Sequence, residues 1–282
     1  MTNNIDSDLY KCIRARFPDA ILISHPAVRG HCFPLFVVNT YDSGTHIIKF
    51  TTEQLCKHNV CVSHIMQDNG IRVPDIDTDK YNDKWFITYK YNPNKTLYEQ
   101  MHNNAITAPQ VFDVYCRIID TNYAISKIPL DKIGGTPGQP IPNANLPVME
   151  YAQVLKSQFT YKPWRWHIYF ALYNKLLSMG RIKLIYNDPQ WRNILVNNDN
   201  TYDSLIDLDA LALANTTVSL IWMLYVYPGY DYDALLDYYE YATHQHVNRK
   251  LILGILHNLK HIKKKDKPNG VYEFLHSNTK TR

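Results

Sequence analysis

The chain has 282 residues, enough for one large domain or for two lobes that each bury a hydrophobic core. Its hydrophobic fraction of 45% and charged fraction of 20% are ordinary for a globular protein, which excludes global disorder and a long coiled coil. A formal net charge of +4 is too small to indicate nucleic-acid binding, so no nucleic-acid partner is expected.

The N-terminal part reads as a small sheet with helices. A helix is expected over residues 8–16, and strands over 21–23, 33–38 and 46–50 form an antiparallel meander. Thr52 and the pair Asn69-Gly70 predict the start and end of a helix over 53–67. A polar turn over 78–84 then precedes a strand over 85–89. We place the lobe boundary after residue 91, giving a nucleotide-binding lobe at 1–91 and a catalytic, substrate-binding lobe at 92–282.

The C-terminal part is mainly helical. Apolar periodicity predicts a helix over 108–125, and the Pro- and Gly-rich residues 129–147 predict an insertion loop. Further helices are expected over 151–161, 163–179, 216–226, 232–244 and 248–263. Residues 210–227 carry no charge, but the first half of this run is polar, so we interpret it as a buried helix and expect no membrane span.

Charge and cysteine usage add two expectations. No Lys or Arg occurs from Asn193 to Asn248, a span rich in Asp. Such an acidic region suits Mg²⁺ or a cationic substrate, and a solvated acidic face is the alternative. Five irregularly spaced cysteines and a polar N-terminus without a signal peptide predict a cytoplasmic protein with reduced thiols.

The chemistry is concentrated in residues 183–209, KLIYNDPQWRNILVNNDNTYDSLIDLD. Asp188 follows an apolar strand in a loop that contains Pro189, and Asn193 precedes a second apolar strand. After a polar turn, the next strand ends at Asp207, so a hairpin would bring these three side chains to one end. Phosphoryl transfer needs this combination: a carboxylate to orient the acceptor hydroxyl, and a carboxylate and an amide oxygen to bind Mg²⁺.

The stretch NDPQWRNILV followed by LIDLD resembles the catalytic and metal loops of the aminoglycoside phosphotransferase and choline kinase-like superfamily. Other matches occur upstream in the same order: HIIKF at 46–50 is similar to the lysine strand, DNGIRVPDI at 68–76 to the segment after the first helix, and FITYKYNPNKTL at 86–97 to the hinge. The resemblance implies an α+β, two-lobed protein kinase-like fold, with a small antiparallel-sheet N-lobe that has one main helix and a larger, mainly helical C-lobe.

The same resemblance implies roles for individual residues. Asp188 would be the catalytic base, Asn193 and Asp207 would hold Mg²⁺, and Lys49 would bind the phosphates of ATP or GTP. Backbone groups at Lys90 and Tyr91 would meet the purine. Further site candidates are Asp209, Glu53 and Arg192.

The implied activity is that of a small-molecule kinase. It would transfer the γ-phosphate of ATP or GTP to a hydroxyl of a small amine-bearing or sugar-like acceptor, of the choline, ethanolamine or aminoglycoside type. Departures from the family pattern keep a non-catalytic nucleotide-binding module open: Tyr186 replaces the family histidine, and Asn59 lies near the place of the glutamate that pairs with the lysine, leaving Glu53 as a stand-in. A protein kinase is disfavoured, because D-F-G, A-P-E and glycine-rich loop motifs are absent from the sequence.

Three other segments carry alternatives. The aromatic and acidic residues 225–241 would form the acceptor pocket through cation–π or stacking contacts, or would simply pack a helical core. His257 and His261 share a helix face, which could hold Zn²⁺, although no carboxylate supports them. The basic run 260–267 is typical of a solvated helix end, with RNA or membrane contact as the alternative.

Overall fold

The computed structural model describes residues 3–24, 34–130, 168, 171–172, 175–176, 183–229 and 231–262. The expected helix at 151–161 and most of the expected loop at 129–147 lie outside these residues. The expected helix at 163–179 is helical at each of its described positions. Within the described residues, the chain divides into a first compact unit that ends at Pro93 and a second that begins at Asn94. The two lobes expected on either side of residue 91 stay a prediction as separate folding units.

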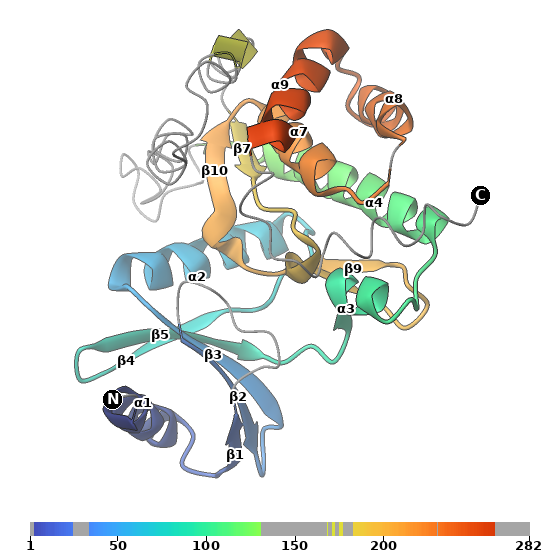
Figure 1. Ribbon diagram of the computed structural model, residues 1–282. Helices are drawn as coiled ribbons and strands as arrows, with labels where there is room; N and C mark the ends of the chain where they lie inside the picture. Colours follow the sequence, from blue (N-terminus) through green and yellow to red (C-terminus); the bar gives the residue numbers. More distant parts are fainter. Residues whose placement is uncertain are drawn as a thin grey trace. The chain divides into compact units, whose positions relative to one another are not determined.

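In the described part of the first unit, five strands form one antiparallel sheet in the order β1-β2-β3-β5-β4 (Figure 1). The expected meander is therefore confirmed for β1 to β3, with β5 joining the far side of β3. The strands are β1 (Ala20–Ser24), β2 (Leu35–Thr40), β3 (Thr45–Thr51), β4 (Asp77–Tyr81) and β5 (Lys84–Lys90).

The polar turn expected over 78–84 is wrong, because most of that segment is strand β4. It pairs antiparallel with β5 from Asp77 opposite Thr88 to Tyr81 opposite Lys84, so only Asn82 and Asp83 form the turn. β4 lies at the edge of the sheet and is largely exposed, so its side chains are polar and carry no apolar alternation. A polar sequence of this kind is also typical of a turn, which explains the wrong prediction.

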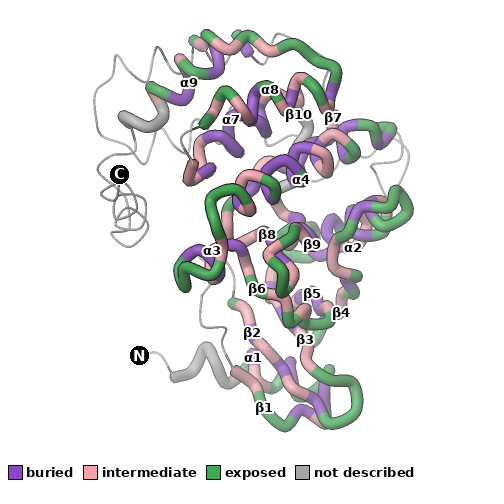
Figure 2. Tube along the Cα trace, turned by 90° about the vertical axis from the view of Figure 1, so that its right-hand side faces the viewer, coloured by how far each residue is buried: buried purple, intermediate pink, exposed green. Residues whose placement is uncertain are grey.

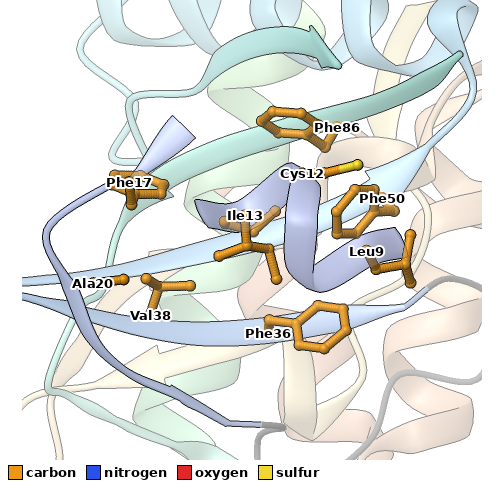
Figure 3. Packing of buried hydrophobic residues seen from close by; sticks show 10 residues of the cluster. Leu9, Cys12, Ile13, Phe17, Ala20, Phe36, Val38, Phe50 and Phe86 are labelled. Atoms are coloured by element: carbon orange, nitrogen blue, oxygen red, sulfur yellow. The ribbon is translucent and has the colours of Figure 1, made fainter. Parts of the chain in front are cut away.

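One face of this sheet packs against helix α1 (Asn3–Arg16), which begins earlier than the expected residue 8. Leu9, Cys12 and Ile13 point from α1 toward the aromatic rings of the strands, as Figure 3 shows. Alternate strand residues such as Phe36 and Phe50 supply the other half of the cluster, as the period of a strand requires. The rings of Phe36 and Phe50 meet edge to face at 5.9 Å.

Helix α2 (Glu53–Asp68) contacts β4 and β5 and lies across the sheet from α1 (Figure 1). Its limits agree with the expected ones because its ends carry clear signals: the Thr52 side chain accepts from the backbone N–H of Leu55, and Asn69 and Gly70 close it. Cys56, Val62 and Met66 are buried on its inner side. The first unit is thus a small sheet between two helices.

Short strands of the second unit contain or pair with residues 183–209, the segment that carries Asp188, Asn193 and Asp207. Within the described residues, β6, β8 and β9 form one antiparallel sheet, and β7 pairs with β10. The bounds are β6 (Lys95–Thr96), β7 (Lys183–Tyr186), β8 (Ile194–Val196), β9 (Tyr202–Leu205) and β10 (Leu211–Ala214). The expected hairpin of β8 and β9 is confirmed.

Helices make up the rest of the described second unit, and α4 contacts α7, α8 and β7. The uncharged run 210–227 differs from a single helix: it begins with strand β10 and continues as α7, whose residues Val218 to Leu224 are all buried (Figure 2). No helix in the described part of the chain has the length and apolarity to cross a membrane. The helices are α3 (Leu97–His102), α4 (Ala108–Lys127), α7 (Thr216–Val226), α8 (Tyr232–Thr243) and α9 (Arg249–Ile262).

Candidate active site

The loop that carries Asp188 leaves the end of a buried strand. Leu184, Ile185 and Tyr186 of β7 are all at most 1% exposed, so the strand is held in the core of the second unit. At Tyr186 the backbone is also held from α4: its N–H donates to Oδ1 of Asn122 at 2.8 Å, and its carbonyl accepts from Nδ2 of Asn122 at 3.1 Å. Asp188 therefore follows a point where both backbone groups are fixed.

A short 3-10 turn, η2 (Trp191–Asn193), carries the chain from Asp188 to Asn193. The Asn193 amide nitrogen Nδ2 donates to Oδ2 of Asp188 at 2.9 Å and to the Asp188 carbonyl at 3.1 Å. Trp191 anchors the turn from the other side, because its indole N–H donates to the carbonyl of Val226 at 2.6 Å. The loop thus brings the predicted base and one predicted metal ligand into direct contact.

The predicted second metal ligand follows the β8–β9 hairpin. The N–H of Ile206 donates to the carbonyl of Asn193 at 2.9 Å, one residue beyond the last strand pair, Ile194 and Leu205. Asp207 then adopts a left-handed conformation with φ 63° and ψ 69°. For a residue with a Cβ this costs about 1–3 kcal/mol, and such conformations cluster at functional sites.

Tyr186 links the two loops. Its hydroxyl donates to the carbonyl of Ile206 at 2.8 Å, and Leu211 of β10 lies opposite it in the β7–β10 pair. Tyr186 is fully buried, and that burial raises its pKa well above the ordinary tyrosine value, with smaller contributions from the nearby Asp188 and Asp207 carboxylates. Both carboxylates therefore lie within electrostatic reach of this phenol.

The donor atoms at this site fit Mg²⁺. Asn193 uses its amide nitrogen on Asp188, so its amide oxygen faces elsewhere, and Asp207 is an exposed carboxylate. Mg²⁺ prefers oxygen ligands and usually takes one or two protein groups together with substrate phosphates. No group of three or more His, Cys, Asp or Glu side chains suited to a metal ion occurs in the described part of the chain.

In the first unit, Lys49 lies on β3 with its backbone paired to Leu35 and Ile87. Its neighbours Ile48 and Phe50 belong to the cluster under α1, so Lys49 belongs to the opposite face of the sheet. That face also carries Ile47 and Ile87, which are 7% and 2% exposed. The half-buried lysine therefore has buried apolar neighbours on its own face of the sheet.

The two residues of the predicted hinge, Lys90 and Tyr91, differ in whether their backbone groups are used within the sheet. The N–H of Tyr91 donates to the carbonyl of Thr45 at 2.9 Å, so this donor is already used in the sheet. In an antiparallel ladder, alternate residues direct their backbone groups to opposite neighbours, so those of Lys90 face away from β3. On that side β4 begins only at Asp77, opposite Thr88, so it does not reach Lys90. Lys90 is thus the better placed of the two to offer backbone groups to a purine.

Glu53 is the first residue of α2, and its carboxylate accepts from Lys57 at 2.6 Å. This contact lowers the pKa of Glu53. Asn59 is buried and donates to the carbonyl of Leu55 within the same helix. The role of Glu53 as a stand-in partner for Lys49 stays a prediction.

The two remaining candidates lie beside the loops. The Arg192 guanidinium stacks over the ring of Tyr98 on α3, 4.7 Å from its centroid, and Tyr98 stacks in turn on His102. Asp209 lies in the short 3-10 turn η3 (Leu208–Ala210), two residues after Asp207, and is half-buried. The structure places both candidates in the second unit with Asp188.

Several side chains of the aromatic and acidic segment 225–241 contact other parts of the second unit. Tyr227 and Tyr239 are buried, and the Tyr238 hydroxyl donates to the Asp120 carboxylate at 3.0 Å. Asp237 and Glu240, which could have met a cationic acceptor, both accept from Arg249 of α9. The core-packing alternative thus holds for Tyr227 and Tyr239, whereas Tyr241 is 77% exposed.

No sequence-family model and no curated protein matches the chain. Solved structures do match it along nearly its whole length. The chain superposes on macrolide 2′-phosphotransferase type I with a TM-score of 0.63 at 17% identity, covering 92% of this chain and 89% of that one. It has the fold of the antibiotic phosphotransferases. The two-lobed kinase-like fold inferred from the motifs is therefore confirmed.

Two further structures support the same conclusion. For the GDP and kanamycin complex of the phosphotransferase APH(2″)-IIIa, the TM-score is 0.67 at 13% identity, with 97% of this chain and 96% of that one covered. For amicoumacin kinase in complex with AMP-PNP and Ca²⁺, it is 0.62 at 9% identity, with 99% and 95% covered. At these identities the likeness concerns the fold.

Asn122 is the residue of this region that sequence reasoning missed. It is 6% exposed and lies on the buried stripe of α4 that Ile118, Ile119 and Ile125 define. A polar residue on an apolar helix stripe needs a buried partner. The amide of Asn122 on this apolar stripe therefore indicates a buried hydrogen bond, but the sequence alone does not identify Tyr186 as the partner.

Proposed function

We propose that this chain is a small-molecule kinase that transfers the γ-phosphate of ATP or GTP to a hydroxyl of a small acceptor. The hydrogen bond from Asn193 to Asp188, with Ile206 bonded to the same asparagine, is the observation that carries the proposal. These bonds bring Asn193 against Asp188 and tie it to the residue before Asp207, which supports a shared site for the three side chains. The antibiotic phosphotransferases with the same fold, solved with nucleotides, support this function.

In the proposed reaction Asp188 accepts the proton of the acceptor hydroxyl while the hydroxyl oxygen forms a bond to the γ-phosphorus. The bond from that phosphorus to the bridging oxygen breaks, and ADP or GDP leaves. Asn193 orients the Asp188 carboxylate through its amide N–H. When bound, Mg²⁺ would neutralise phosphate charge, held by the amide oxygen of Asn193 and the Asp207 carboxylate.

Lys49 would bind the nucleotide phosphates from the sheet of the first unit. Its half-buried place beside the buried Ile47 and Ile87 supports this role, because attraction between a lysine and a phosphate is stronger where water is partly excluded. Lys49→Met should raise the KM for nucleotide, with Lys84→Met as a matched control from the exposed start of β5. Equal KM values in both variants would remove Lys49 from the site.

A small acceptor is favoured over a protein acceptor by the segment that follows Asp207. Only η3 and β10 separate it from Asn215, the N-cap of α7, so this part of the chain has no room for an activation loop. We propose an amine-bearing or sugar-like alcohol, of the choline, ethanolamine or aminoglycoside type. Macrolides extend the set of acceptors to be tested, because this chain shares its fold with a macrolide phosphotransferase.

The test is nucleotide turnover with a panel of such acceptors, in the parent chain and in Asp188→Asn. The variant should bind nucleotide normally and lose turnover, because the amide cannot accept the hydroxyl proton. Asp113→Asn, an exposed position on α4, is the matched control. Parental turnover in Asp188→Asn would reject the mechanism.

The second candidate function is a nucleotide-binding module without transfer. The amide of Asn59, near the place where the family has a glutamate, favours it, because an amide cannot form an ion pair with Lys49. Tight nucleotide binding with no turnover on any acceptor would establish this alternative.

A further inference from the structure

The main chain around Ile206 is held on both sides by groups from the neighbouring loop. Its N–H donates to the carbonyl of Asn193 at 2.9 Å, and its carbonyl accepts from the hydroxyl of Tyr186 at 2.8 Å. The next residue is Asp207, whose backbone φ of 63° is uncommon for residues other than glycine. A strained residue thus directly follows a residue whose backbone N–H and carbonyl are both hydrogen-bonded.

Tyr186 is itself fixed in space. It is fully buried, and Asn122 on α4 binds both its N–H and its carbonyl. The contact from Asn122 comes from 64 positions earlier in the sequence, so it ties the loop to the core of the second unit. The path from α4 to Asp207 therefore runs through hydrogen bonds to Asn122, Tyr186 and Ile206.

We propose that Tyr186 is a positioning residue whose hydroxyl, through the Ile206 carbonyl, holds Asp207 in the left-handed conformation that its metal-binding role requires. The inference rests on the proposed function for the metal role, but its backbone part stands without it. Strained conformations persist only where the surroundings over-determine them, and this hydroxyl supplies one such constraint on the residue before Asp207.

Tyr186→Phe removes one oxygen atom and keeps the ring in the core. We expect it to weaken binding of Mn²⁺, used as the probe with ADP and with GDP, by about 10- to 100-fold, the usual effect of losing a group that orients a ligand. Tyr239→Phe is the matched control, because it loses a buried hydroxyl that bonds to Thr216 on α7. Its Mn²⁺ affinity should equal that of the parent.

A second measurement does not depend on metal or nucleotide. Without the hydrogen bond from the Tyr186 hydroxyl to the Ile206 carbonyl, Asp207 can relax out of the strained conformation and recover part of the lost stability. Glycine at 207 has no strain to release. Tyr186→Phe should therefore cost more stability in an Asp207→Gly background than in the parent, in urea unfolding of the four proteins.

The outcomes separate the two proposals. If the parent binds Mn²⁺ with nucleotide and Tyr186→Phe binds it equally well, the positioning role is overturned and the kinase proposal stands. If the parent does not bind it, the kinase proposal falls, and the unfolding cycle decides the backbone role alone. Equal costs of Tyr186→Phe in both backgrounds, or failure of both variants to fold, would overturn that role.

Discussion

The amide nitrogen of Asn193 donates a hydrogen bond of 2.9 Å to the carboxylate of Asp188, and the same atom reaches the Asp188 carbonyl at 3.1 Å. One side chain therefore sets both the position of the loop and the orientation of the carboxylate. Because the amide oxygen remains for another ligand, the proposed base and the proposed metal site share a residue.

Substitution of Asn193 should affect turnover and its pH dependence. Asn193→Ala removes a hydrogen bond to a charged group, worth about 1.5–3 kcal/mol, so kcat/KM should fall by about 10- to 100-fold. Asn193→Asp keeps an oxygen ligand but places a second carboxylate beside Asp188, which should raise the pKa of the base. The acidic limb of the pH–rate profile should then move to higher pH. A profile that keeps its parental shape would contradict this relationship.

Position 207 should prefer glycine to alanine. Because a Cβ destabilises the left-handed conformation by about 1–2 kcal/mol and glycine loses part of that gain as chain entropy, Asp207→Gly should be more stable than Asp207→Ala by about 0.5–1 kcal/mol. Urea unfolding measures the difference. At Asp113, inside α4, the order should reverse, since alanine is the better helix former there. Alanine as the more stable residue at both positions would argue against the strain.

The cluster between α1 and the sheet should dominate the stability of the first unit. Ile13 is fully buried there, so Ile13→Ala should lower the free energy of unfolding by about 2–5 kcal/mol through the lost contacts and the cavity. Ile21 on β1 is 67% exposed, and Ile21→Ala should change it by less than about 0.5 kcal/mol. Chemical denaturation of both variants, followed by circular dichroism, compares them; similar costs would show that α1 does not pack as described.

Glu240 should contribute to stability in a pH-dependent way. Its carboxylate accepts from the N–H of Val247 and from Arg249, and these contacts lower its pKa below the ordinary value of 4.5. A carboxyl with a lowered pKa stabilises the folded state above its unfolded pKa and loses that effect as the pH falls through its folded pKa. Glu240→Gln should therefore destabilise the protein at pH 7.

The same variant should match the parent once the pH lies below the folded pKa of Glu240, where both side chains are neutral. Thermal unfolding of the two proteins from pH 7 to pH 3 tests this. A gap between them that stays constant over the whole range would mean that charge has no part in the contact between α8 and α9.

The sequence by itself determined the elements whose signals are local. The caps of α2, the strands beside Asp188 and Asp207, and the hairpin between β8 and β9 follow from turn residues and from apolar periods of 2 and 3.6, which depend on backbone geometry within a few residues. The spacing of Asp188, Asn193 and Asp207 is readable for the same reason. Edge strand β4 was not predicted as a strand, because an exposed strand lacks the apolar alternation that identifies a half-buried one.

The tertiary structure alone decided which side chains meet. Nothing near Asn122 in the sequence points to Tyr186, and the left-handed backbone of Asp207 becomes visible only with its surroundings. The acidic residues of α8 looked suited to a cationic acceptor until Arg249 was found bound to Asp237 and Glu240. Periodicity reports which face of an element is buried, but the partner on that face depends on segments that are distant in the chain and adjacent in space.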